Sequence, residues 1–246
     1  MTAPGHDSSS IYGWAGKIGL VIPSNNTVIE PEFWAAAPAR VTVHSARVLS
    51  HGNTPEGIVL MERNVTRAVK ELDGGGMSVI AYACLATSLV KGRAWDDAIR
   101  VEIETSTGRP ATTAAAATVA AVKAAGARRI GIATPYTKRI GALVAPFFES
   151  CGLAPLAVQN LEIEDSREIW KTTPATLFEL AVSADVAGAE AICILATDLP
   201  TLGVTGAIAA ELGKPVITTN AAILWQSLAL AGIPANTSQP FEKPGP

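Results

Sequence analysis

One short stretch of the chain combines a thiol with neighbouring hydroxyl groups. Residues 77–89 read Met-Ser-Val-Ile-Ala-Tyr-Ala-Cys-Leu-Ala-Thr-Ser-Leu and follow three glycines at 74–76. The apolar and small residues at its start predict a buried strand, which ends in Cys84, Thr87 and Ser88. A thiolate is a nucleophile and a thiol can give up a proton, so Cys84 is the first candidate for chemistry.

A second stretch has a similar pattern later in the chain. Residues 195–202 read Leu-Ala-Thr-Asp-Leu-Pro-Thr-Leu and follow another apolar run. When they are aligned with residues 82–89, Thr197 stands opposite Cys84. We therefore expect these two side chains to approach one ligand from opposite sides.

The elements around the two stretches occur twice in the same order. Three pairs of residues recur: Pro23 and Pro135, Cys84 and Thr197, and Pro110 and Pro215. Their offsets are 112, 113 and 105 residues. Near-constant offsets in one order indicate an internal duplication, and the alternation of strands and helices indicates parallel sheets.

The duplication predicts an α/β protein of two pseudo-symmetric, flavodoxin-like halves. Each half is expected to be a parallel sheet flanked by helices, with the active site in the cleft between the halves. The first half is placed at 15–111 together with part of the C-terminal helix, 220–232, and the second half at 112–219. Residues 1–14 are expected to form a flexible tail and residues 233–246 a Pro-rich tail.

Local patterns predict the helices that surround the thiol. Residues 56–72 have apolar positions at helical spacing and predict one amphipathic helix. Another helix is expected to begin near Gly92, and a third to cover 138–150. Thr27 is the candidate N-cap of a short helix after the first strand.

Composition and charge exclude several classes of partner. The chain has 246 residues and a net charge of −3, without a basic stripe, which argues against a nucleic-acid partner. The three cysteines are an odd number without metal-type spacing, so we interpret them as reduced thiols and expect no metal. The N-terminus lacks signal-peptide features and no apolar run could cross a membrane, so a cytoplasmic protein is expected.

Three motifs resemble one branch of a known superfamily. Residues 22–30, Ile-Pro-Ser-Asn-Asn-Thr-Val-Ile-Glu, resemble the Pro-Ser-Ser-Asn-Thr loop of the maleate isomerase and arylmalonate decarboxylase branch of the aspartate/glutamate racemase superfamily. Residues 83–86, Ala-Cys-Leu-Ala, resemble its first-half cysteine loop, and 134–136, Thr-Pro-Tyr, match its second-half tyrosine motif. The resemblance covers roughly residues 16–232, and it implies that no cofactor is used.

The chain departs from the branch at two positions. Maleate isomerases carry a second cysteine where this chain has Thr197, and an asparagine where it has Ser166. Arylmalonate decarboxylases carry one cysteine in the second half and a glycine in the first, which is the reverse of the arrangement around Cys84.

The resemblance and the residue chemistry together nominate the site. Cys84 and Thr197 are the expected catalytic residues. The expected substrate-binding residues supply hydroxyl, amide, backbone or packing contacts from both halves: Ser24, Asn26, Thr27, Leu85, Thr87, Ser88, Tyr136, Thr137, Ser166 and Asp198.

A single thiol leaves three functions open. Racemisation needs an acid and a base on opposite faces of a carbon, and the hydroxyl of Thr197 is too weak an acid for either role. Cis–trans isomerisation of a maleate-like dicarboxylate through a Cys84 thiolate needs one nucleophile, and decarboxylation of an arylmalonate needs one proton donor. The third alternative is a non-catalytic carboxylate-binding protein. The expected partner is thus a small dicarboxylate or arylmalonate, and a homodimer or higher homo-oligomer is compatible with the resemblance.

Overall fold

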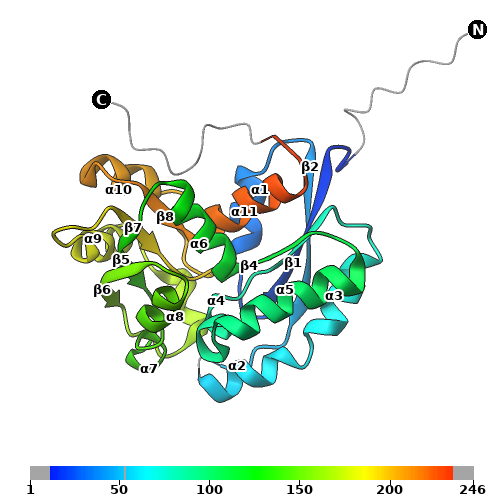
Figure 1. The fold of residues 1–246 in the computed structure, drawn as a ribbon, viewed down its shortest axis with the longest axis horizontal. Coiled ribbons are helices and arrows are strands. Elements are labelled where there is room, and N and C mark those ends of the chain that lie inside the picture. The colour runs from blue at the N-terminus through cyan, green and yellow to red at the C-terminus, as the bar shows by residue number, and fades with distance from the viewer. Residues whose placement is uncertain (1–11, 53, 235–246) are drawn as a thin grey trace, which may run out of the picture.

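The computed structural model describes residues 12–52 and 54–234 and contains two parallel four-stranded sheets (Figure 1). The first sheet has the order β2-β1-β3-β4, with β1 (Gly16–Pro23), β2 (Val41–Val48), β3 (Val79–Tyr82) and β4 (Ala111–Thr113). The second has the order β6-β5-β7-β8, with β5 (Arg129–Thr134), β6 (Ala154–Asn160), β7 (Ala191–Ile194) and β8 (Val216–Thr218). The predicted fold of two similar α/β halves is therefore confirmed. Most of both predicted tails, 1–11 and 235–246, lies outside the described residues.

Helices cover the sheets, as continuous apolar strands require. The first half contains α1 (Ile29–Ala36), α2 (Pro55–Glu62), α3 (Val65–Asp73), α4 (Leu85–Lys91) and α5 (Arg93–Thr107). The second half contains α7 (Lys138–Gly141), α8 (Val144–Ser150), the 3₁₀ helix η2 (Ser166–Lys171), α9 (Pro174–Ala184) and α10 (Thr205–Leu212).

Two further helices join the halves into one core. The Ala-rich α6 (Ala114–Ala124) and α11 (Thr219–Leu230) pack against each other at the centre of the molecule (Figure 1). Each contacts both β4 and β8, and α11 also contacts β3. One cluster of buried apolar residues consequently runs from the first sheet through these helices into the second sheet.

Two helix predictions were wrong in their boundaries. The single helix expected over 56–72 is divided, because Asn64 donates its backbone N–H to the carbonyl of Met61 in a tight turn that interrupts the helical ladder. As a result α2 packs against α4, whereas α3 packs on β1 and β2. The helix expected over 138–150 is likewise divided into α7 and α8.

The helix expected to begin near Gly92 is α5, but the sequence analysis did not anticipate the short helix α4 that precedes it. α4 starts directly after Cys84, and Gly92 separates it from α5 with a φ of 84°, a conformation that glycine adopts without strain. The thiol therefore stands at a strand-to-helix junction and not on a long loop.

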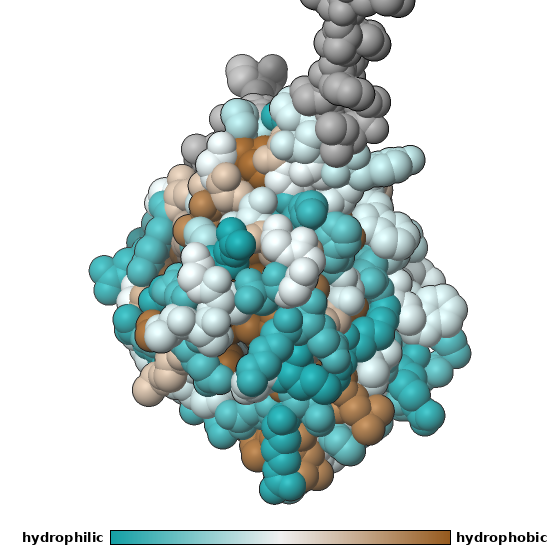
Figure 2. Space-filling model, turned by 90° about the vertical axis from the view of Figure 1, so that its right-hand side faces the viewer, coloured by the Kyte–Doolittle hydropathy of each residue, from teal (hydrophilic) through white to brown (hydrophobic). Residues whose placement is uncertain are grey.

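The molecular surface seen from the first half is mostly hydrophilic. Figure 2 shows that face, the right-hand side of Figure 1, with apolar residues scattered in small separate areas. Within residues 12–52 and 54–234, no helix combines the length and the apolar composition that crossing a bilayer requires.

Candidate active site

A small cavity lies where the carboxyl ends of the two sheets meet. In each sheet the chain order reverses around the first strand, which is where open α/β sheets bind ligands. The cavity is lined by the loops after β1, β2, β3, β5 and β7, with further residues from α2 and η2. The lining residues are Pro23, Asn25, Ser50, Gly52, Gly57, Ile58, Met61, Cys84, Leu85, Ala86, Tyr136, Ser166, Ile169, Thr197 and Asp198.

Cys84 lies in this cavity and is almost completely buried, with 6 % of its surface exposed. The hydroxyl of Thr87 donates to its Sγ at 3.2 Å. Burial raises the pKa of the Cys84 thiol, while hydrogen bonds from the hydroxyl and the backbone amide of Thr87 lower it. The negative charge of Asp198 adds to the rise. The protein thus surrounds one thiol with groups that donate to a developing thiolate.

Strand register corrects the expected partner of Cys84. β1 pairs with β3 so that Val21 stands beside Tyr82, and β5 pairs with β7 so that Ala133 stands beside Ile194. Val21 and Ala133 are 112 residues apart, Tyr82 and Ile194 are 112 residues apart, and so are Pro23 and Pro135. Cys84 lies two residues after Tyr82, and Ala196 lies two residues after Ile194. The residue of the second half that corresponds to Cys84 is therefore Ala196. The alignment of Thr197 with Cys84 was therefore wrong by one residue.

Thr197 connects the two halves through its hydroxyl. Its Oγ1 accepts from Nδ2 of Asn26 at 2.9 Å and donates to the carbonyl of Ala83 at 3.3 Å. Both contacts cross from the second half to the first. Because its hydroxyl proton is already bonded to a carbonyl, this geometry favours a role in holding the halves together over a role as catalytic acid.

Asn26 replaces Thr27 as the residue that caps the first helix. Its Oδ1 accepts the backbone N–H groups of Val28 and Ile29 at 3.0 and 3.1 Å, while the side chain itself is buried. Thr27 is exposed, so its predicted capping role was wrong. The amide of Asn26 thus accepts from the helix through Oδ1 and donates to Thr197 through Nδ2.

Two ionisable groups face the cavity from the second half. Burial raises the pKa of Tyr136 well above its usual range, and the charges of Asp198 and Cys84 add to that shift. Burial also raises the pKa of Asp198 to about 7, although a hydrogen bond to its own backbone opposes the shift. The phenol is therefore neutral near pH 7, and the partly buried carboxyl titrates there.

Asn25 and Ser166 meet across the cavity from different halves. Nδ2 of Asn25 donates to Oγ of Ser166 at 3.0 Å, although the residues are 141 positions apart. Oδ1 of Asn25 is buried without a hydrogen-bond partner. A half-turn of the amide would let Ser166 donate to Oδ1 and would free both N–H groups for a ligand.

The remaining nominated residues have different positions. Leu85 lines the cavity, whereas Ser24 supports its wall, accepting the backbone N–H of Ser50 at 3.0 Å. Thr87 bonds to Cys84 from behind, and Ser88 turns away to donate to Asp96 at 2.5 Å. Thr137 caps α7 by position and is not among the lining residues.

Sequence reasoning missed the wall that α2 and η2 contribute. Ile58 and Met61 project from α2 and Ile169 from η2, and all three are buried apolar residues of the cavity. Gly57 lies so close to the backbone carbonyl of His51 that a side chain there would collide with it. The signal that could have found this wall was the pair of glycines at 52 and 57, on either side of the point where α2 begins.

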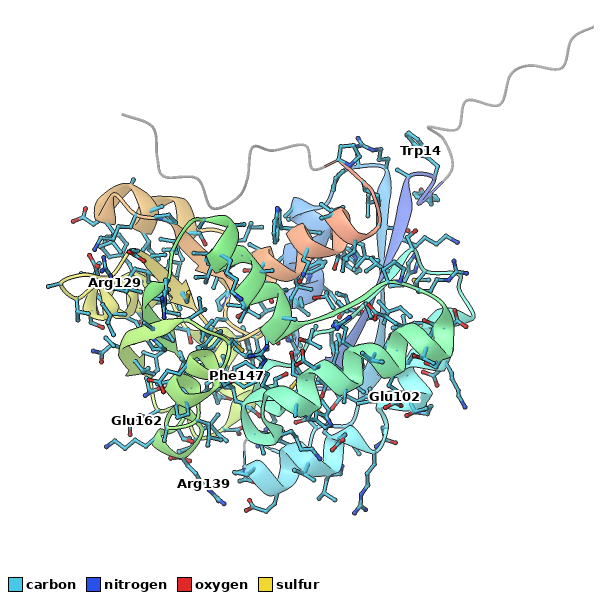
Figure 3. The ribbon with its side chains drawn as sticks, in the orientation of Figure 1. Trp14, Glu102, Arg129, Arg139, Phe147 and Glu162 are labelled. Carbon is cyan, nitrogen blue, oxygen red and sulfur yellow. The ribbon has the colours of Figure 1, made fainter. Side chains whose placement is uncertain are left out.

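The halves also meet at the rim. Arg139 of α7 forms an exposed ion pair with Glu56 of α2 at 2.7 Å, and Figure 3 shows its side chain extending at the lower edge of the molecule. Such exposed pairs contribute little energy. In the part of the chain that the structure describes, no group of three His, Cys, Asp or Glu side chains could hold a metal ion.

This chain is similar to enzymes of known activity. The chain is 29% identical over 217 residues to arylmalonate decarboxylase of Bordetella bronchiseptica, covering 87% of this chain and 90% of that protein. It is 28% identical over 231 residues to maleate isomerase of Alcaligenes faecalis, covering 88% and 91%.

A solved structure provides a third comparison. It is a cysteine-to-serine mutant of Nocardia farcinica maleate cis–trans isomerase with a covalently bound succinylcysteine intermediate. It aligns with a TM-score of 0.84 at 26% identity, covering 89% of this chain and 94% of that chain. The sequence profile of the arylmalonate decarboxylase family matches residues 18–240. This chain therefore belongs to the arylmalonate decarboxylase family, within the branch of the aspartate/glutamate racemase superfamily that also contains the maleate isomerases.

Proposed function

We propose that the protein is a cofactor-independent cis–trans isomerase of a maleate-like dicarboxylate, with Cys84 as its nucleophile. The observation that carries the proposal is the single thiol in the cavity: Cys84 lines it from the first half, while the equivalent position of the second half is Ala196. Addition and elimination at an alkene need only one thiolate. Two-base racemisation would need a second acid or base opposite it.

The reaction would proceed by addition, rotation and elimination. The Cys84 thiolate forms a C–S bond to one alkene carbon, and the π electrons move into the adjacent carboxylate to give an enediolate. Rotation about the new C–C single bond follows. The electrons then return, the C–S bond breaks, and the trans isomer and the thiolate are released with no net proton change. If the enediolate were protonated instead, the product would be a succinylcysteine, the adduct described for the Nocardia relative.

Neutral groups would bind the substrate carboxylates. Among the described residues that line the cavity there is no lysine or arginine. The donors available are the phenol of Tyr136, the amide of Asn25 and the hydroxyl of Ser166, with Asp198 contributing when it is protonated. Apolar contacts from Ile58 and Met61 would cover the carbon backbone of a small substrate. Donors of this kind would stabilise the enediolate as an oxyanion hole does.

A second candidate is decarboxylation of an arylmalonate. It is favoured by the match to the arylmalonate decarboxylase family and by the 29% identity to the Bordetella enzyme. In that reaction carbon dioxide leaves first, and the Cys84 thiol then protonates the planar enediolate on one face. This route also needs only one thiol.

Proton NMR in deuterated water tests both candidates. Maleate and phenylmalonate are incubated separately with the wild type, with Cys84→Ala and with the matched control Cys151→Ala. Cys151 lies outside the lining residues of the cavity, so its variant should behave as the wild type. Fumarate from the wild type and Cys151→Ala, but not from Cys84→Ala, is the expected result.

The other outcomes are equally informative. Deuterated phenylacetate in place of fumarate would identify the protein as a decarboxylase and contradict the isomerase. Turnover of neither compound, with dicarboxylate binding that survives in Cys84→Ala, would contradict both reactions and favour a binding protein.

A further inference from the structure

A buried chain of hydrogen bonds ends on the thiol of Cys84. The phenol of Tyr82 donates to Oγ1 of Thr87 at 3.0 Å, and Thr87 donates in turn to Sγ of Cys84 at 3.2 Å. Tyr82 and Thr87 are completely buried. Neither is among the residues that line the cavity. The two side chains therefore reach the thiol from behind, on the side away from the cavity.

The position of Tyr82 is fixed from several directions. Its ring packs edge-to-face on Trp95 with centroids 5.6 Å apart, and the indole of Trp95 donates to Glu62 at 2.6 Å. Glu62 also pairs with Lys91, the last residue of α4. Burial holds the pKa of Tyr82 well above its usual range, so the phenol keeps its proton and remains a donor.

The second half has no counterpart of this chain. The strand registers place Ile194 at the position of Tyr82 and Ala196 at that of Cys84. Beyond these positions the halves diverge, because α4 begins at Leu85 in the first half whereas the next helix of the second half, α10, begins only at Thr205. Ile194 and Ala196 are both buried apolar residues. The strand-end tyrosine and the helix that carries Thr87 thus occur only in the half that carries the thiol, whereas a purely structural hydrogen bond would have no reason to follow the cysteine.

We propose that Tyr82 and Thr87 are positioning residues that orient Sγ of Cys84 and stabilise its thiolate. The proposal rests on the proposed role of Cys84 as nucleophile, and it changes the role of Thr87 from a substrate donor to a support of the thiol. A thiolate accepts hydrogen bonds more strongly than a thiol does. Each donor in a chain also strengthens the next, so Tyr82 acts on Cys84 through Thr87.

Alkylation of Cys84 by iodoacetamide tests the proposal without any substrate. The rate is measured between about pH 6 and pH 10 by mass spectrometry of the Cys84 peptide, in the wild type, Thr87→Val, Thr87→Ser and Tyr82→Phe. Valine has nearly the shape of threonine, so access to the thiol is preserved. The partly exposed Cys151 reports in the same sample on the reagent and on the integrity of the fold.

The expected changes differ among the variants. Thr87→Val should slow alkylation of Cys84 near pH 8 by about tenfold and move its pH profile upward by about one unit, because a hydrogen bond to a charged group is lost. Tyr82→Phe should slow it by about threefold, because its effect passes through Thr87. Thr87→Ser should stay within about twofold of the wild type, because it keeps the hydroxyl.

An unchanged Cys84 profile in Thr87→Val would overturn the proposal. If that variant does not fold, as reported by circular dichroism and by Cys151, an unchanged profile in Tyr82→Phe would overturn it instead. Failure of the proposed function would be seen separately. If the wild type turns over no substrate but Thr87→Val still shifts the pH profile of Cys84 alkylation, the proposed reaction is contradicted and the support of the thiol by Thr87 is not. Where turnover exists, Thr87→Val should lower kcat and leave KM nearly unchanged, whereas a substrate donor would raise KM.

Discussion

At the scale of single residues, Ala196 occupies an unusual backbone conformation. Its φ is 133°, in a region that L-residues rarely adopt, and it is buried where the first half carries Cys84. Such a strained backbone conformation persists only where the contacts of the surrounding structure hold it in place, and it often occurs beside a binding site. Here the neighbours are Thr197 and Asp198, which line the cavity.

Adding a second thiol should test which residue faces Cys84. Ala196→Cys should give a protein that exchanges the α-proton of 2-phenylpropionate for deuterium, because a base and an acid would then stand on opposite faces. Thr197→Cys is the matched control and should show no exchange above the wild type. Exchange measured by NMR in the Thr197 variant alone would contradict the strand-register assignment.

Asp198 should make stability depend on pH. Its pKa is about 7 in the folded protein, against an ordinary value of 3.8, because burial disfavours the carboxylate. Between these values the folded state holds the extra proton, so the contribution of Asp198 to stability is fully present below about pH 4 and is lost as pH rises through about 7. The shift corresponds to at most about 4 kcal/mol, and less because the side chain is only partly buried.

The measurement is the Tm of the wild type and Asp198→Asn at pH 5 and pH 8. Asparagine cannot ionise, so its Tm should change less between the two values. An equal change in both proteins would show that Asp198 does not titrate in this range.

At the scale of elements, α1 fastens the loop that follows β7. Glu32 accepts the backbone N–H groups of Thr201 and Leu202 at 2.5 and 2.7 Å and the amide of Asn220 at 2.7 Å. Its carboxylate thereby ties a helix of the first half to the loop that carries Asp198. Few other residue types could accept so many donors at once.

Removing this carboxylate should weaken the fold. Glu32→Ala should lower the free energy of unfolding by about 2 kcal/mol, because several donors lose their partner. Glu71→Ala, which removes an exposed ion pair with Arg67, should cost less than about 0.5 kcal/mol. Urea denaturation measures the free energy of unfolding of both variants. Equal decreases in Glu32→Ala and Glu71→Ala would contradict the proposal that Glu32 holds the loop after β7 in place.

At the scale of the whole molecule, the two halves are joined by buried polar contacts as well as by a shared core. Asn26, Thr197 and the carbonyl of Ala83 form one chain of hydrogen bonds between them. α6 and α11 supply the apolar part of the same junction. The cavity lies at this junction, so its shape depends on how firmly the halves are held.

Thr197→Val should separate the bridging role of Thr197 from a catalytic one. It preserves shape but removes both hydrogen bonds, so the protein should lose about 1–3 kcal/mol of stability. Thr197→Ser should retain stability and activity. If Thr197 were a proton donor in the reaction, Thr197→Val would abolish turnover with little change in urea stability.

The sequence by itself determined the duplicated α/β architecture and the position of Cys84 at the end of a strand. Apolar runs, turn residues and recurring prolines are local signals, so they can be recognised without knowing the fold. The cavity-lining positions of Tyr136, Ser166 and Asp198 followed from the motifs and the resemblance. The helix boundaries did not, because no glycine or proline marks the break at Asn64.

Only the tertiary structure decided which side chains meet. The partner of Cys84 is set by backbone hydrogen bonds, from Ala83 to Val21 and from Leu195 to Ala133, and two similar loops can be aligned in more than one way without them. Consecutive residues of a helix point about 100° apart, so Thr87 reaches the thiol while Ser88 turns to Asp96. The contact between Asn25 and Ser166 joins residues 141 positions apart, and no local pattern encodes a contact at that separation.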